Sequence, residues 1–233
     1  MRIKPIDIAR KLKISTSALR HYESWGILPP IERSANGYRM YTEEHVAYFE
    51  CIRAMHPGFG FALTSDVLRK LIVQDINAAL WMVNERQASL HQDKMIAEKT
   101  IQLLESTEFI EDRVSDIKPR MTIGQVSRET GIPSSAIRHW DKMGILQIPR
   151  DPDNGYRLLS DSHLRKILLI RTLKSAVWSL DVISEVLSEL DDNNYEQARR
   201  VARDSLKYLD RIVQNQLRGM HSLYLLCSKL KLT

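Results

Sequence analysis

The chain has only two cysteines in 233 residues, Cys51 and Cys227, and they form no CxxC pair. This scarcity excludes a disulfide framework and a four-cysteine metal site. No apolar run approaches the roughly 18 residues of a membrane span, and no signal-peptide pattern opens the sequence. It also lacks a nucleophile–base pairing, a glycine-rich phosphate loop and histidines at metal-ligand spacing. These absences predict a soluble, cytoplasmic protein that is not an enzyme and needs no cofactor.

The surplus of positive charge is small, and its distribution is more informative than its size. The net charge is +5. Residues 1–75 and residues 118–190 each carry 11 Lys and Arg against 8 Asp and Glu. Residues 76–117 are net −4, whereas residues 191–233 are net +3. Basic and acidic stretches therefore follow the architecture of the chain.

The chain also contains an internal repeat. Residues 14–53 and 132–171 align without a gap at an offset of 118, with 15 of 40 positions identical. The period is much longer than the 20–50 residues of a solenoid unit. The repeat therefore indicates a duplicated domain.

Each copy has the local signals of a helix-turn-helix followed by a hairpin. Ser15 and Pro133 suit the start of a second helix, because serine caps a helix and proline fits its first turn. Gly26 and Gly144 suit its end. An Asn-Gly pair follows in each copy, which is the strongest short signal for a β-hairpin. Two further helices are predicted in each copy, at 43–55 and 64–73, and at 161–174 and 180–190.

A long helix is predicted after each copy. Its apolar positions step by alternating three and four residues, as in a coiled-coil seam. The first stripe comprises Leu80, Val83, Gln87, Leu90, Lys94, Ala97, Ile101 and Leu104, and the second Leu209, Val213, Gln216, Met220, Leu223, Cys227 and Leu230. Gln87, Lys94 and Gln216 weaken the pattern, so an amphipathic helix that packs on its own domain stays open as an alternative.

These elements predict a mainly α fold with two winged helix-turn-helix domains, each with a small β-hairpin wing and a long coiled-coil helix. The first domain spans residues 1–75 and its helix 76–113. A linker at 114–120 leads to the second domain at 121–190. The second long helix, at 191–233, is expected to pair antiparallel with the first.

The repeated motifs resemble the DNA-binding domain of the MerR (mercuric-resistance regulator) family. The first copy reads Leu-Arg-His-Tyr-Glu from Leu19, Gly-Ile-Leu-Pro from Gly26 and Asn-Gly-Tyr-Arg-Met-Tyr from Asn36. The second copy has similar motifs from Ile137, Gly144 and Asn154. The resemblance implies bacterial transcription regulators that bind double-stranded DNA as two-fold dimers. It also implies a helix in the major groove, a wing along the backbone and a distorted promoter that RNA polymerase can use.

The resemblance and the general geometry of helix-turn-helix proteins assign candidate DNA-binding residues. The first turns of the recognition helices are expected to reach base edges, arginines one turn later to grip guanine or phosphate, and wing and third-helix arginines to hold the backbone. The set comprises Ser15, Thr16, Ser17, Arg20, His21, Tyr22, Arg39 and Arg53 in the first copy, and Ser134, Ser135, Arg138, His139, Trp140, Arg157 and Arg171 in the second.

Structural roles compete with some of these assignments. Tyr38 and Tyr156 are expected to pack within the wing rather than contact DNA. His21 and His139 are expected to pack or to make a minor phosphate contact, not to bind metal. Both cysteines are expected to be buried, because free cysteine behaves as a small hydrophobe. Trp140 stands where the first copy has Tyr22, so its phosphate contact is in doubt.

The duplication predicts that one chain folds as its own pseudo-dimer. The long helices carry opposite net charge, which favours pairing them with each other over self-pairing. Ser15 against Pro133 and Thr16 against Ser134 predict two half-sites that differ. A homodimer with four heads is the alternative.

Two other functions stay open at this stage. One is an architectural protein that bends or bridges DNA across the nucleoid. The other is a ligand-gated regulator with a pocket between a head and the coiled coil. Candidate lining residues of that pocket are Trp81, Met82, Trp178 and Tyr224.

Overall fold

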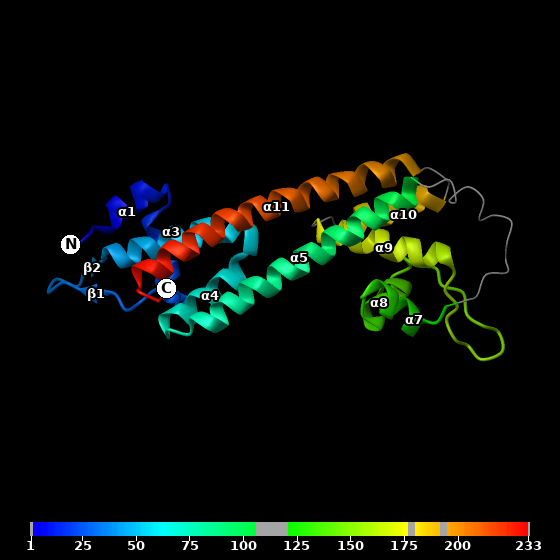
Figure 1. Ribbon diagram of the computed structural model, residues 1–233, viewed down its shortest axis with the longest axis horizontal. Helices are drawn as coiled ribbons and strands as arrows, with labels where there is room; N and C mark the ends of the chain where they lie inside the picture. The colour runs from blue at the N-terminus through cyan, green and yellow to red at the C-terminus, as the bar shows by residue number, and fades with distance from the viewer. Residues whose placement is uncertain (1, 106–120, 177–179, 192–194, 233) are drawn as a thin grey trace. The chain divides into compact units, whose positions relative to one another are not determined.

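The computed structural model describes residues 2–105, 121–176, 180–191 and 195–232. They divide into two compact units (Figure 1). Unit 1 comprises residues 1–90 with 210–233, and unit 2 comprises residues 91–209. Each unit therefore contains one copy of the repeat, the beginning of one long helix and the end of the other. Within the described ranges, no helix is long and apolar enough to cross a membrane.

The first head, in unit 1, has the predicted order of elements. Helices α1 (Pro5–Leu12) and α2 (Thr16–Ser24) precede a two-stranded antiparallel sheet of β1 (Glu32–Arg33) and β2 (Arg39–Met40). Helices α3 (Glu43–Phe59) and α4 (Phe61–Ile72) follow. Figure 1 shows β1 and β2 as a hairpin at one side of the head. Helix α3 runs four residues past its predicted end, through Pro57, because the chain first turns at Gly60, where φ is +77°.

The second head repeats this order, but its wing is less regular. It consists of α7 (Ile123–Thr130), α8 (Ser134–Lys142), α9 (Asp161–Ser175) and α10 (Leu180–Asp191). In place of two paired strands, a single antiparallel bridge joins Arg150 and Arg157. Pro149 and Pro152 lie on either side of Arg150 and Asp151 in the sequence, and neither has a backbone N–H to donate to a β-ladder. The Asp151 carboxylate accepts from the Asp153 backbone N–H (2.9 Å), which turns the chain instead.

Each unit has its own hydrophobic core. In unit 1, head residues such as Tyr41, Phe49 and Met55 share a core with residues from both long helices, among them Val83 and Leu226. In unit 2 the core residues of the head lie with Leu104, Ala198, Val201 and Ala202. Both cysteines belong to the core of unit 1, with 0% and 1% of their surface exposed. The prediction that both cysteines are buried is confirmed.

The long helices are α5 (Ile76–Glu105) and α11 (Tyr195–Lys229). The predicted end of the first at 113 and the linker at 114–120 lie outside the described residues. Buried positions recur every seven residues, as a coiled-coil pattern requires. They are Val83, Leu90, Ala97 and Leu104 in α5, and Ala202, Leu209, Gln216 and Leu223 in α11.

Part of the predicted seam is wrong. Leu80 and Val213 are 40% and 52% exposed. Thr100 and Gly219, which carry no apolar signal, are buried instead. The buried positions Thr100 and Gly219 pack against head helices, so small and polar residues occupy them.

Candidate nucleic-acid interface

The first turn of α2 presents a polar edge in the first head. The side chain of Ser15 caps the helix by accepting from the Ala18 backbone N–H (3.1 Å). Ser15, Ser17 and Arg20 are exposed, and Thr16 is half-buried. Arg20 therefore lies one turn into the helix, beside exposed hydroxyl groups. This is the arrangement that reads base edges in helix-turn-helix proteins.

The second head has the same arrangement with a different first residue. Pro133 occupies the cap position of α8 and provides no side-chain cap. Ser134 is half-buried, whereas Ser135, Arg138 and His139 are exposed. The two heads therefore present the same kind of edge with different hydrogen-bonding groups.

An equivalent ion pair ties the wing to the recognition helix in both heads. In the first head, Glu23 of α2 accepts from Arg39 of β2, and Arg33 of β1 lies 3.5 Å from the same carboxylate. In the second, Asp141 of α8 accepts from the Arg157 Nε (2.6 Å). The side chains of Arg157 and Asp141 are only 21% and 14% exposed. Arg39 and Arg157 therefore both hold a wing against its recognition helix.

A groove of about 560 Å³ runs between α1, α2 and the wing of the first head. Its basic lining includes Arg2 and Lys4, which the sequence analysis did not select. The backbone pair Ile3–Tyr41 holds this N-terminal segment beside the wing, with Ile3 donating to the Tyr41 carbonyl (2.8 Å). The full lining is Arg2, Ile3, Lys4, Pro5, Ile6, Thr16, Arg20, Tyr38, Arg39 and Met40. The sequence signal that could have identified this lining is the pair of basic residues, Arg2 and Lys4, among the first four positions.

The wing tyrosines are exposed rather than packed. Tyr38 is 75% exposed and Tyr156 is 72% exposed. The expectation that they pack within the wing is wrong. The residues that turn each hairpin satisfy one another through their own polar groups, such as Ser34 accepting from the Tyr38 backbone N–H (3.1 Å). The aromatic rings are therefore free to project.

Aromatic residues of the recognition helices have packing roles. His21 stacks on Trp25, with ring centroids 5.7 Å apart. Tyr22 is half-buried and packs near Trp25 and Phe49. Trp140 is only 5% exposed and belongs to the core of unit 2. Its assignment as a DNA-binding residue is therefore not carried further, because its indole is enclosed by apolar side chains.

The two third-helix arginines differ in environment. Arg53 of α3 is exposed. Arg171 of α9 donates to the Thr130 carbonyl and lies 3.6 Å from the Asp93 carboxylate of α5. Arg171 is thus engaged inside unit 2, and only Arg53 is available for a phosphate contact.

The residues suggested for a ligand pocket do not share one environment. Trp81 is 71% exposed and Tyr224 is 61% exposed, while Met82 packs against the core of unit 1. Trp178 lies outside the described residues. Within the described part of the chain, no group of three or more His, Cys, Asp and Glu side chains is placed to hold a metal ion.

Comparison with known protein families agrees with this geometry. The family described as MerR HTH family regulatory protein matches residues 3–65 and 121–190, which is more than half of the chain. The chain belongs to the MerR family. Both copies of the repeat are matched, so the membership covers both winged helix-turn-helix heads.

Curated relatives match over shorter stretches. The HTH-type transcriptional regulator CueR of Salmonella typhi is 31% identical over 72 residues, which is 31% of this chain and 52% of the relative. CueR of Escherichia coli O6:H1 is 30% identical over 95 residues, 41% of this chain and 70% of the relative. HmrR of Rhizobium leguminosarum bv. viciae is 26% identical over 96 residues, 40% of this chain and 74% of the relative. The chain thus spans about half the length of the first of these relatives. No solved structure gives a significant match.

Proposed function

We propose that the protein is a sequence-specific DNA-binding transcription regulator in which one chain provides two different heads. The observation that carries the proposal is the pair of exposed edges on α2 and α8. Each edge has hydroxyl groups in its first turn and an arginine one turn later, Arg20 or Arg138. An equivalent ion pair holds a wing beside each edge.

The proposed interface uses a subset of the candidate residues. Base contacts are assigned to Ser15, Thr16, Ser17 and Arg20 in the first head, and to Ser134, Ser135 and Arg138 in the second. Backbone contacts are assigned to Arg2, Lys4, Tyr38 and Arg53, with His21, Tyr22 and His139 at the margin. Arg39 and Arg157 are assigned to positioning the wings, through their ion pairs with Glu23 and Asp141.

The pairing of heads with long helices supports a single-chain pseudo-dimer. Lys229, at the end of α11, donates from its Nζ to the Glu43 carbonyl of the first head (2.8 Å). The C-terminal half of α5 contacts the second head through Asp93 and Arg171. The C-terminal half of each long helix therefore packs on the head that belongs to the other copy. Two chains would supply these contacts in a symmetric dimer, and we propose that one chain supplies both in this protein.

A regulator built this way would read two half-sites that are not identical. Operator symmetry follows protein symmetry, and this chain has Ser15 where the second head has Pro133. We propose that it acts on a bacterial promoter, distorts the DNA between the half-sites and makes the promoter available to RNA polymerase. This function would be exercised at the nucleoid, in the cytoplasm.

Selection of bound sequences from a randomised DNA pool tests the proposal. Purified full-length chain is used at a stated salt concentration, because phosphate contacts make affinity fall steeply with salt. We expect one enriched site with two unlike halves. A perfectly palindromic site would contradict the asymmetry. A pool without enrichment, together with broad occupancy along the genome, would favour an architectural role over a regulator.

A further inference from the structure

The contact between the first head and α11 depends on two glycines. A Cβ added to Gly58 of α3 would lie 2.5 Å from the backbone nitrogen of Gln216 in α11. A Cβ added to Gly219 of α11 would lie 3.0 Å from the Met55 Cα and 3.3 Å from the Ala54 carbonyl oxygen. The Gln216 Nε2 also donates to the Gly58 carbonyl (3.1 Å). The backbones of α3 and α11 thus approach too closely for side chains between them.

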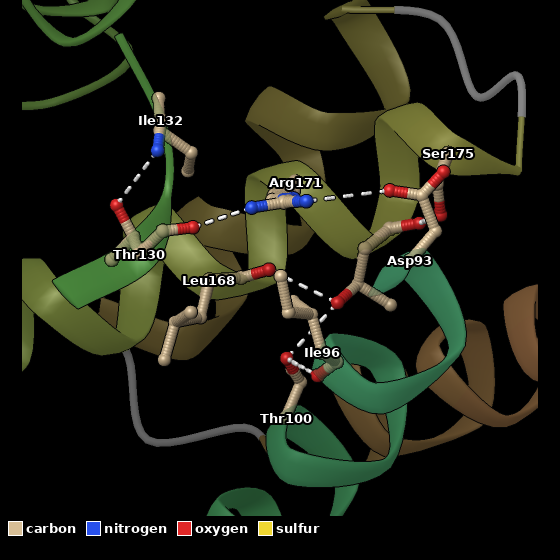
Figure 2. Close-up of polar contacts among 9 residues, drawn as sticks. Asp93, Ile96, Thr100, Thr130, Ile132, Leu168, Arg171 and Ser175 are labelled. Carbon is tan, nitrogen blue, oxygen red and sulfur yellow. Dashed lines mark hydrogen bonds and ion pairs between the residues drawn. The ribbon is translucent and has the colours of Figure 1, made fainter. Parts of the chain in front are cut away.

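The contact between the second head and α5 uses polar side chains instead. The Thr100 hydroxyl of α5 lies 2.9 Å from the Thr172 hydroxyl of α9, and both residues are buried. Asp93 of α5 pairs with Arg171 of α9 (3.6 Å). Figure 2 shows Arg171 between the Thr130 carbonyl and Asp93, with Thr100 further along α5.

These two contacts lie at equivalent positions of the duplicated protomer. Helices α5 and α11 begin 119 residues apart, and their buried positions keep that offset. Helices α3 and α9 begin 118 residues apart. Thr100 therefore corresponds to Gly219, and Thr172 corresponds to Ala54. By the same offsets, Asp93 corresponds to Ile212, and Arg171 to Arg53.

Exchanging the helices between the heads would break both contacts. With α5 on the first head, Thr100 would take the place of Gly219, where an added Cβ alone already comes within 3.0 Å of the backbone of α3. With α11 on the second head, Ile212 would replace Asp93 and leave Arg171 without its carboxylate. Removing one partner from a shielded ion pair costs more than the pair itself contributes. Each head thus accepts one long helix and rejects the other.

We propose that Gly58, Gly219 and Gln216 at the first head, and Asp93, Thr100, Arg171 and Thr172 at the second, select the helix that packs on each head. This selection prevents two chains from assembling as a symmetric dimer in which α5 of one chain packs on the first head of the other. The inference rests on the single-chain arrangement proposed above and names the residues that enforce it.

Disulfide trapping in the full-length chain tests the selection. One variant carries Thr100→Cys with Thr172→Cys, which joins α5 to the second head. The matched variant carries Thr100→Cys with Ala54→Cys, which reports α5 on the first head. The native cysteines stay in place, because both are buried, and the unsubstituted chain is oxidised in parallel. Circular dichroism checks that each variant is folded, and peptide mass spectrometry identifies the linked pair.

We expect a disulfide from the first pair and none from the second. A disulfide between residues 100 and 54 would overturn the selection, since the first head would then accept α5. Absence of both disulfides in folded protein would also overturn it, because Thr100 would not lie beside Thr172 in solution. A 100–172 disulfide that joins two chains, at twice the 27.0 kDa chain mass, would leave the selection standing and contradict the single-chain pseudo-dimer.

Discussion

The substitution Gly58→Ala probes the close approach of α3 and α11 within unit 1. In an ordinary helix, replacing glycine by alanine stabilises the helix by about 0.8–1.0 kcal/mol. Gly58 lies inside α3, so propensity alone predicts a gain in the free energy of unfolding. Its environment predicts the opposite, because the new Cβ would meet three backbone atoms of α11 at 2.5–2.9 Å.

The cost follows from what must move. Backbone atoms cannot rotate away as the end of a flexible side chain can, so α11 must shift by most of an ångström. Overpacking of this kind costs about 1–3 kcal/mol. The shift also stretches the hydrogen bond from Gln216 to the Gly58 carbonyl, which contributes roughly 0.5–1.5 kcal/mol. After the propensity gain is subtracted, we expect a net loss of about 2 kcal/mol.

Thermal unfolding followed by circular dichroism measures this loss. For a chain of this size, 1 kcal/mol corresponds to about 2–4 °C in Tm, so we expect the Tm of the chain to fall by roughly 4–8 °C. The matched control is Gly124→Ala in α7, where the new Cβ would come no closer than 3.9 Å to the nearest side-chain atom. The control should be neutral or slightly stabilising.

Equal behaviour of the two variants would refute the reasoning. If Gly58→Ala is neutral or stabilising, α11 does not approach α3 in solution as the structure has it. A carbodiimide cross-link between Lys229 and Glu43, whose charged groups lie 3.7 Å apart, gives an independent reading of the same contact. Its yield should fall in Gly58→Ala and be unchanged in Gly124→Ala.

Three further predictions concern the interface and the cores. Arg20→Ala should weaken binding to the selected site by about 1–3 kcal/mol in a competition titration, with the loss confined to one half-site; an equal loss on every sequence would assign Arg20 to phosphate. Asp141→Asn should lower the stability of unit 2 by about 1.5–3 kcal/mol in urea unfolding, since Arg157 loses a charged partner, and an unchanged midpoint would contradict this role. Burial raises the pKa of Cys51 from 9.0 to about 12, and burial also raises the pKa of Cys227. The thiols therefore stabilise the fold fully below pH 9 and lose this contribution as pH rises toward 12. Urea midpoints should fall over that range, and less so in Cys51→Ala.

Most of the fold was predictable because the local signals are strong and occur twice. Ser15 caps α2 as expected, and Gly26 and Gly144 adopt positive φ directly after their helices. The irregular wing of the second head was less predictable. Both copies carry the same Asn-Gly signal, but neighbouring prolines remove donors that a ladder needs.

The packing of heads on helices was not predictable from hydrophobic periodicity. Thr100 is buried because it contacts α9, and Gly219 and Gln216 are buried because they contact α3. None of these residues is apolar enough to add to a hydrophobic stripe. Periodicity instead favoured Leu80 and Val213, which are largely exposed. A sequence pattern reports burial of apolar surface, whereas these contacts depend on small size and paired polar groups.

The exposure of the recognition-helix arginines was predictable, whereas the internal contacts of Arg39, Arg157 and Arg171 and the placement of the aromatic residues were not. Arg20 and Arg138 are exposed on equivalent edges, as their motif positions indicated. Tyr38 is exposed although packing was expected, and Trp140 is buried in the core of unit 2 although a DNA contact was expected. Whether an aromatic side chain is buried depends on which side of its helix or hairpin faces the core. A single sequence does not determine that side.

Sedimentation velocity of the protein bound to its selected DNA site tests the central claim most directly. The claim is that one chain supplies both heads to one bipartite site. The account predicts a complex with one 27.0 kDa chain per DNA site, at protein concentrations just above saturation. A complex that contains two chains on that site would contradict it.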